Sequence, residues 1–343
     1  MSTIEPLRVR ADAPDVVEIP SGHLELSWRP LTLTDAAELQ ALLLICAAED
    51  EEHERQTFED VVEALSGSWK DLDRDTLGGF DASGGLRACA MVEVRPGDTR
   101  TLRCFLFGRI HPQWRGRGLG RALVTWMEGR GRQKLVESGK ELPARLATFL
   151  DERARDHRRL YAAAGFSPVR WYTDMRRDLA APLPGLEVPQ FTRIVPWTPD
   201  LDDEVRLAHN DAFADHWGSE PATAETWAAS AAATAPEWSF VALSDEGERP
   251  GVVGYLMSSR REQNWPVAGY TYGYADIIGV RRSARGQGLA AALLVTAMTA
   301  YRDSGMEFAA LSVDTANPTG AFGMYERLGF RPIHGTVLYS VEL

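Results

Sequence analysis

Cysteine is scarce in this sequence. The only three are Cys46, Cys89 and Cys104, an odd number without the spacing of a metal site. The sequence therefore predicts neither a disulfide framework nor a metal centre. It favours reduced thiols in a cytoplasmic protein.

Long apolar runs are missing as well. No run approaches the roughly 20 residues that span a bilayer, and no basic-then-apolar signal opens the chain. The formal net charge of −12 argues against nucleic acid or an acidic membrane as the main partner. These absences leave a cytoplasmic protein whose acidic character suits a small cationic substrate.

The length of 343 residues exceeds that of one ordinary domain. A segment rich in Pro, Asp and Glu at 1–22 predicts a flexible tail. The run of Ala, Pro and Gly at 180–190 predicts a linker. We therefore expect an N-terminal domain over 23–179 and a C-terminal domain over 191–343.

Apolar periodicity predicts a similar order of elements in both halves. The expected strands lie at 85–95, 100–110 and 145–150 in the first half, and near 237–244, 251–259, 270–280 and 308–314 in the second. Helices follow 110 and 280 and precede the end of each half. The predicted fold class is α/β: two tandem domains, each a mixed, mostly antiparallel sheet flanked by helices.

A short glycine loop occurs twice. One copy runs from Arg115 to Gly120 and the other from Arg285 to Ala290. Each follows an apolar run, ending at Ile110 or Val280, and each opens an apolar helix. Such a loop directs backbone N–H groups and a helix N-terminus at one point, which suits the phosphates of a nucleotide-like cofactor.

Both loops resemble the signature loop of the GNAT superfamily of acyl-CoA-dependent N-acyltransferases. A second resemblance to that superfamily is a tyrosine that precedes Gly-Phe near the end of each half. Tyr161 precedes Gly165-Phe166, and Tyr325 precedes Gly329-Phe330. Two fused halves resemble the mycothiol synthase group within it. That group tends to carry a glutamate on the strand before the loop, where this chain has Tyr274.

The resemblance implies acetyl-CoA as co-substrate and no metal. The loop amides would hold its pyrophosphate, and the strand ending at Val280 would pair with its pantetheine amides. Asn317 would contact the pantetheine arm, cap the N-terminus of the following helix, or do both. The expected cofactor-binding residues are Ile278, Gly279, Val280, Arg285, Gly286, Gln287, Gly288, Leu289, Ala290 and Asn317 in the second half, and Ile110, Arg115, Gly116, Arg117, Gly118, Leu119 and Gly120 in the first.

Two side chains are candidate catalysts. A phenol, with a pKa of about 10, stays protonated at neutral pH and can donate to a departing thiolate. Tyr325 occupies that family position, although it could instead cap the core. Asp276 lies on the same strand face as Ile278 and Val280 by the two-residue period, and is the candidate general base. It could equally be an exposed polar side chain at a strand edge, or cap a turn.

The acceptor side is predicted from composition. Asp215, His216 and Trp217 combine an acid, an imidazole and an aromatic ring, which suits a small pocket. The strand before the first loop offers no acid, and no asparagine precedes Tyr161 at the expected place. The first half is therefore expected to bind coenzyme A without catalysis or to be a vestigial site, the alternative being that it acts on a separate acceptor.

The function that fits these residues is transfer of an acetyl group from acetyl-CoA to the primary amine of a small molecule, by a monomer or homodimer. A protein N-acetyltransferase and a non-catalytic acyl-CoA sensor or scaffold remain alternatives. A dinucleotide-binding fold is disfavoured, because the strands before the loops are predicted to be antiparallel.

Overall fold

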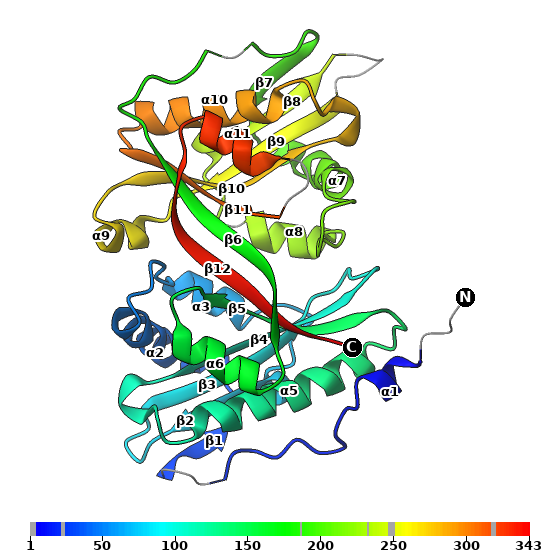
Figure 1. The fold of residues 1–343 in the computed structure, drawn as a ribbon, viewed down its shortest axis with the longest axis vertical. Coiled ribbons are helices and arrows are strands. Elements are labelled where there is room, and N and C mark those ends of the chain that lie inside the picture. The colour runs from blue at the N-terminus through cyan, green and yellow to red at the C-terminus, as the bar shows by residue number, and fades with distance from the viewer. Residues whose placement is uncertain (1–4, 22–24, 186, 232, 246–250, 317–319) are drawn as a thin grey trace. The chain divides into compact units, whose positions relative to one another are not determined.

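The computed structural model describes residues 5–21, 25–185, 187–231, 233–245, 251–316 and 320–343 (Figure 1). The chain forms two compact units. Unit 1 comprises Met1–Val169 and Val337–Leu343, and unit 2 comprises Arg170–Thr336. Within the described residues, no helix is both long and apolar enough to cross a membrane.

Unit 1 has a sheet in the order β1-β2-β3-β4-β5-β12. The strands are β1 (Ser27–Arg29), β2 (Thr76–Phe80), β3 (Leu86–Val94), β4 (Leu102–Ile110), β5 (Ala144–Asp151) and the last part of β12 (Arg331–Glu342). The α-helices are α1 (Leu7–Arg10), α2 (Ala36–Glu49), α3 (Phe58–Ala64), α4 (Leu72–Asp75), α5 (Leu119–Glu137) and α6 (Arg155–Ala163).

The two faces of this sheet carry separate cores. Helix α5 buries Leu123 and Met127 on one face, and helix α2 buries Leu39 on the other. Leu39, Leu42 and Leu43 are all buried, as their helical spacing predicts. The turn that leads into α2 is fixed by Asp35, whose carboxylate accepts from the Thr32 amide at 2.8 Å.

The N-terminal segment differs from the flexible tail expected over 1–22. Leu7 and Ala11 are buried in the unit 1 core, and the Leu7 amide donates to Glu141 Oε2 at 2.7 Å. Arg132 donates to the carbonyl of Ala11. Burial of these apolar side chains outweighs the polar composition that suggested disorder.

Unit 2 has a sheet in the order β6-β11-β10-β9-β8-β7. The strands are β6 (Ser167–Asp178), β7 (Thr192–Pro196), β8 (Phe240–Ser244), β9 (Gly251–Ser259), β10 (Tyr272–Val280) and β11 (Phe308–Asp314). The α-helices are α7 (Asp202–Ala212), α8 (Ala224–Ala231), α9 (Trp265–Ala268), α10 (Leu289–Asp303) and α11 (Ala321–Arg327). The predicted order of elements in this half is confirmed.

Unit 2 also has two cores, one on each sheet face. Leu256 packs with α10, whereas its neighbours Tyr255 and Met257 pack with α7. The face covered by α10 is called the α10 face below, and the opposite one the α7 face. Tyr255 crosses the backbone at Gly279, where an added Cβ would lie 2.3 Å from its ring. Glycine is therefore required there for packing.

The two units differ from the domains expected at 23–179 and 191–343. A strand near the end of each expected domain belongs to the unit formed mainly by the other half of the sequence. Strand β6 precedes the Pro-Gly linker, yet it pairs antiparallel with β11, from Asp178↔Phe308 to Tyr172↔Asp314. At the other end of the chain, Leu343 and Ala144 exchange backbone hydrogen bonds beside β5. Unit 2 begins at Arg170, before the linker at 180–190. A domain boundary placed at the linker from composition alone therefore lies too far along the chain.

We expect Gly279→Ala to lower the free energy of unfolding by about 1–3 kcal/mol, because the Tyr255 ring has to move. The Tyr255 hydroxyl is held by His209 Nδ1 at 2.7 Å, which limits that movement. Gly251→Ala is the matched control on β9, since a Cβ there meets nothing within 4 Å. Urea denaturation should separate the two variants, and equal stabilities would contradict the packing argument.

Candidate functional site

The two glycine loops have the same backbone conformation. Gly116 and Gly118 have φ values of 75° and 93°, and Gly286 and Gly288 have values of 78° and 79°. Gly118 and Gly288 are the N-caps of α5 and α10. This left-handed geometry favours glycine and leaves the first helical N–H groups without partners in the helix. Each loop therefore presents an anion-binding helix N-terminus.

The first arginine of each loop anchors it to a neighbouring helix. Arg115 Nη2 lies 2.8 Å from Asp50 Oδ2, beyond the end of α2. Arg285 Nη1 lies 3.1 Å from Asp215 Oδ2 and its Nη2 donates to the carbonyl of Ala212, the end of α7. The structure thus places the expected acceptor residue Asp215 against the loop, where it positions Arg285.

The strands flanking the second loop part from each other. The parallel pairing of β10 with β11 runs from Tyr272↔Phe308 to Ala275↔Leu311 and ends there. Both strands continue, β10 to Val280 and β11 to Asp314. Within the described residues, Ile278, Gly279 and Val280 pair with β9 but not with β11. Their other backbone edge can accept an extended ligand.

A β-bulge lies where the strands part. The pairing of β10 with β9 shifts register between Ala275↔Ser258 and Ile277↔Met257, so Asp276 is the extra residue. Ala275 and Ile278 both pack on the α10 face, whereas Ile277 packs on the α7 face. Asp276 therefore does not share a face with Ile278 and Val280, because a bulge interrupts the two-residue period.

The Asp276 carboxylate contacts Ser259 and Arg261, which lie at the end of β9 and just beyond it. Ser259 Oγ donates to Asp276 Oδ1 at 3.0 Å, and Arg261 Nη2 lies 3.0 Å from the same oxygen. The Arg261 guanidinium also lies over the Tyr274 ring, 3.6 Å from its centroid. Residue spacing carries no signal for Arg261, which lies beyond the end of β9.

Tyr325 lies on α11, at the α10 face. Its ring packs edge-on against Phe330 with centroids 6.0 Å apart, and both residues belong to the core on that face. Burial raises the pKa of Tyr325 to about 12. The phenol is therefore protonated across the neutral range, as an acid requires. Asn317, the expected pantetheine contact, lies outside the described residues.

His216 and Trp217 meet the end of β11. His216 Nε2 lies 3.8 Å from Asp314 Oδ2, and Arg170 on β6 donates from Nε to the same oxygen at 2.9 Å. The Arg170 guanidinium lies over the Trp217 ring, 4.9 Å from its centroid. Asp314 and Arg170 were not singled out from the sequence, because only the strand pairing brings them together.

Unit 1 repeats the backbone of this site without the carboxylate on the strand before the loop. The parallel pairing of β4 with β5 runs from Leu102↔Ala144 to Phe105↔Ala147, the same extent as in unit 2. The pairing of β3 with β4 has no register shift, so unit 1 has no bulge on β4. The counterpart of Asp276, counted from the strand end, is the buried Leu106.

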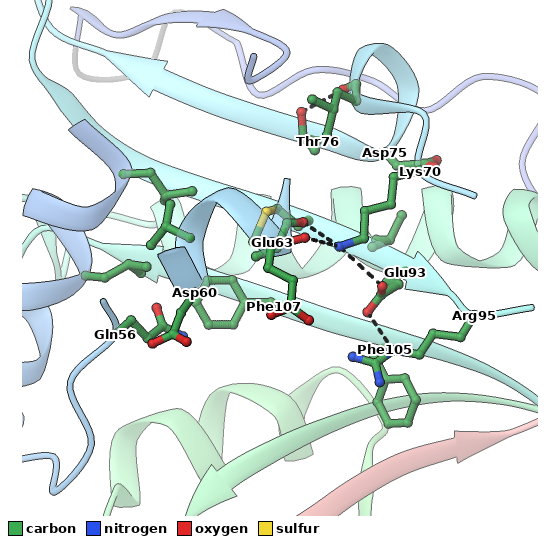
Figure 2. Close-up of a pocket in the computed structure, with 17 residues that line it drawn as sticks. Gln56, Asp60, Glu63, Lys70, Asp75, Thr76, Glu93, Arg95, Phe105 and Phe107 are labelled. Carbon is green, nitrogen blue, oxygen red and sulfur yellow. Dashed lines mark hydrogen bonds and ion pairs between the residues drawn. The ribbon is translucent and has the colours of Figure 1, made fainter. Parts of the chain in front are cut away.

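Unit 1 also contains a cavity of about 310 Å³. Figure 2 shows it between α3 and the strands, with the Lys70 ammonium among oxygen acceptors. Lys70 Nζ donates to the carbonyls of Glu63 and Ala64 at 2.9 and 2.8 Å and lies 3.6 Å from Glu93 Oε1. Burial lowers the pKa of Lys70. The polar groups of the cavity thus pair with one another.

Comparison with known proteins agrees with this geometry. Residues 203–330 match the acetyltransferase (GNAT) family model. A mycothiol acetyltransferase of Thermobispora bispora is 33% identical over 241 residues, 67% of this chain and 73% of the relative. One from Acidothermus cellulolyticus is 34% identical over 251 residues, with 67% and 69% covered.

Solved structures show the same fold over nearly the whole chain. A GCN5-related N-acetyltransferase from Sphaerobacter thermophilus has a TM-score of 0.69 at 27% identity, covering 95% of this chain and 97% of the other. A tandem GNAT protein from the clavulanic acid biosynthesis pathway has a TM-score of 0.64 at 19% identity, with 93% and 98% covered.

These matches define the class of the protein as the acyl-CoA-dependent N-acetyltransferases. The chain belongs to the GNAT acetyltransferase family. Its two glycine-loop units make it a tandem member, similar to the mycothiol acetyltransferases. The resemblance drawn from the two loops and the two Tyr-Gly-Phe endings is thereby confirmed.

We expect Gly288→Glu to remove coenzyme A uptake by unit 2 and Gly118→Glu to remove any uptake by unit 1, since each adds a carboxylate where the diphosphate is expected. Gly305→Glu is the matched control. It has the same left-handed strain, with a φ of 82° and open space, at the other end of α10. Calorimetric stoichiometry measures the effect, and unchanged binding in Gly288→Glu would contradict the loop assignment.

Proposed function

We propose that unit 2 transfers an acetyl group from acetyl-CoA to the primary amine of a small molecule. The observation that carries this proposal is the opening beyond Ala275 and Leu311, next to the Gly286–Gly288 loop. A diphosphate on the loop would direct an extended pantetheine arm along the unpaired edge of Ile278, Gly279 and Val280. A backbone N–H there would polarise the thioester carbonyl, a contribution of typically about 3 kcal/mol.

Tyr325 is proposed as the general acid. It lies on the α10 face, and its burial keeps the proton on the phenol at neutral pH. A departing thiolate, whose conjugate acid has a pKa of about 8.5, would receive that proton. The acid would therefore act from one side of the sheet, and the other side is left for the amine.

Asp276 would act on the α7 face. Its Oδ1 lies in an ion pair with Arg261 and accepts a hydrogen bond from Ser259. An ionised carboxylate attracts a substrate ammonium. Arg261 and Ser259 already occupy Oδ1, which argues against the general-base role first expected. We therefore propose that Asp276 binds the acceptor.

A small-molecule acceptor is favoured over a protein by the similarity to mycothiol acetyltransferases. That similarity does not identify the acceptor of this chain. In this chain Tyr274 stacks on Arg261 at the position where that group tends to carry a glutamate, which gives the α7 face different polar groups. For unit 1 we propose coenzyme A binding without turnover.

Thiol release from acetyl-CoA tests the proposal. The full-length protein should release coenzyme A when given at least one primary amine from a panel of an alkylamine, an amino sugar, an amino-acid amide and an aminoglycoside. A histone-tail peptide tests the protein-acceptor alternative. Tight binding of acetyl-CoA without release by any acceptor would reject the proposal in favour of a sensor.

Replacing Tyr325 by Phe should lower kcat by about 10²-fold, within the range of acid catalysis, and leave the Kd of acetyl-CoA unchanged. Tyr161→Phe in unit 1 is the matched control. That tyrosine is equally buried, and a side-chain hydrogen bond with Thr148 involves its hydroxyl. Steady-state kinetics and calorimetry provide the two measurements. Equal kcat values for Tyr325→Phe and the wild type would exclude the acid role.

A further inference from the structure

The segment that follows α7 contacts both the second glycine loop and the end of β11. Asp215 lies against Arg285 of the loop, and the next residue, His216, lies 3.8 Å from Asp314. Both contacts are within unit 2. The imidazole is thereby held between the expected diphosphate site and the far wall of the opening between β10 and β11.

Asp314 is a buried carboxylate at the end of β11. Its side chain is 4% exposed, against 21% for that of His216. Leu311 and Val313 pack on the α10 face, so the strand period places Asp314 and Ser312 on the α7 face. His216 and Asp314 thus lie on the face opposite Tyr325, on the same side as Asp276.

We propose that His216 is the general base that removes the proton from the acceptor amine, with Asp314 as the residue that positions its imidazole. This inference rests on the proposed acetyl transfer and assigns one step of it. Its structural basis is the placement of a half-buried imidazole beside a buried carboxylate, at the open end of the splayed strands.

The step balances as follows. The substrate ammonium gives a proton to the imidazole nitrogen that does not face Asp314. The amine nitrogen then forms a bond to the thioester carbonyl carbon, and the carbon–sulfur bond breaks. Tyr325 donates its proton to the leaving thiolate, and the second proton, which the nitrogen loses as the amide forms, returns the phenolate to phenol. The products are the N-acetylated amine and coenzyme A, with one proton released.

The charges around His216 favour a neutral ring. Burial lowers its pKa, while Asp314 raises it and Arg170 lowers it. Asp215, the preceding residue, raises it as well. Asp314 does not dominate, because Arg170 occupies the same carboxylate oxygen at 2.9 Å. The net pKa lies below the usual 6.5, so the ring can accept a proton at neutral pH.

Unit 1 provides an internal comparison. Asp50 lies on Arg115 as Asp215 lies on Arg285, so Glu51 corresponds to His216. The parallel strand pairings start at Ala144 and Phe308, which makes the buried Leu150 the counterpart of Asp314. Unit 1 keeps the loop anchor and the strand opening without the imidazole–carboxylate pair. The fold therefore does not require that pair.

The test measures kcat against pH from 5 to 10 in the full-length protein, with acetyl-CoA and an amine that the wild type acetylates. We expect His216→Asn to lower kcat at pH 7 by about 10²-fold or more. We also expect it to abolish the fall in wild-type kcat below pH 6.5, without changing the Kd of acetyl-CoA. Added imidazole should restore part of the rate in His216→Ala. Glu51→Gln is the matched control and should keep the wild-type rate and profile.

Asp314→Asn tests the positioning role. It should lower kcat about 10-fold and move the acid limb of the profile, with a thermal midpoint that shows a folded chain. Wild-type kcat and profile in His216→Asn would overturn the base assignment and leave the acetyltransferase proposal standing. Failure of the wild type to acetylate any amine, with acetyl-CoA still bound, would overturn both.

Discussion

The parting of β10 from β11 after Ala275 and Leu311 is the constraint on which the candidate site depends. A thioester carbonyl must be reached by an amine from one side and by a proton donor from the other. A continuous parallel ladder would fill the backbone edge of Ile278–Val280 with hydrogen bonds to β11. Because that pairing stops at Ala275 and Leu311, β11 leaves this edge open in the part of the chain that the structure describes. The bulge at Asp276 lies at the same point and turns an acidic side chain to the α7 face.

Charge on that face is organised by arginine. Arg261 is paired with Asp276, Arg170 with Asp314 and Arg285 with Asp215, so each of the three carboxylates has one guanidinium partner. Pairing lets a carboxylate stay ionised without creating a strong negative potential that would protonate a neighbouring imidazole. Arg170 thus offsets part of the effect of Asp314 on the His216 imidazole, whose pKa is lowered mainly by burial.

Local motifs made part of this site predictable. The glycine loops and the tyrosines before Gly-Phe carry their chemistry in consecutive residues, and the apolar period located α2, α5 and α10. Three features were beyond that reasoning. A bulge depends on the partner strand, so Asp276 was assigned to the wrong face. Asp314 and Arg170 become neighbours of His216 only through pairing of β6 with β11. The Thr-Leu-Gly-Gly-Phe strand β2 has too little β-branched character to stand out.

The exchange of strands makes each sheet depend on both halves of the sequence. Strand β6 lies between α6 of unit 1 and the linker, yet its ladder with β11 is part of the unit 2 sheet. The final residues, from Val337, belong to unit 1. Neither sheet can be completed from one half of the sequence alone. Loss of the N-terminal half of the sequence would remove β6, the strand that presents Arg170 to Asp314. The unit 2 strand β6 is thus encoded ahead of the linker, and the last residues of unit 1 are encoded at the far end of the sequence.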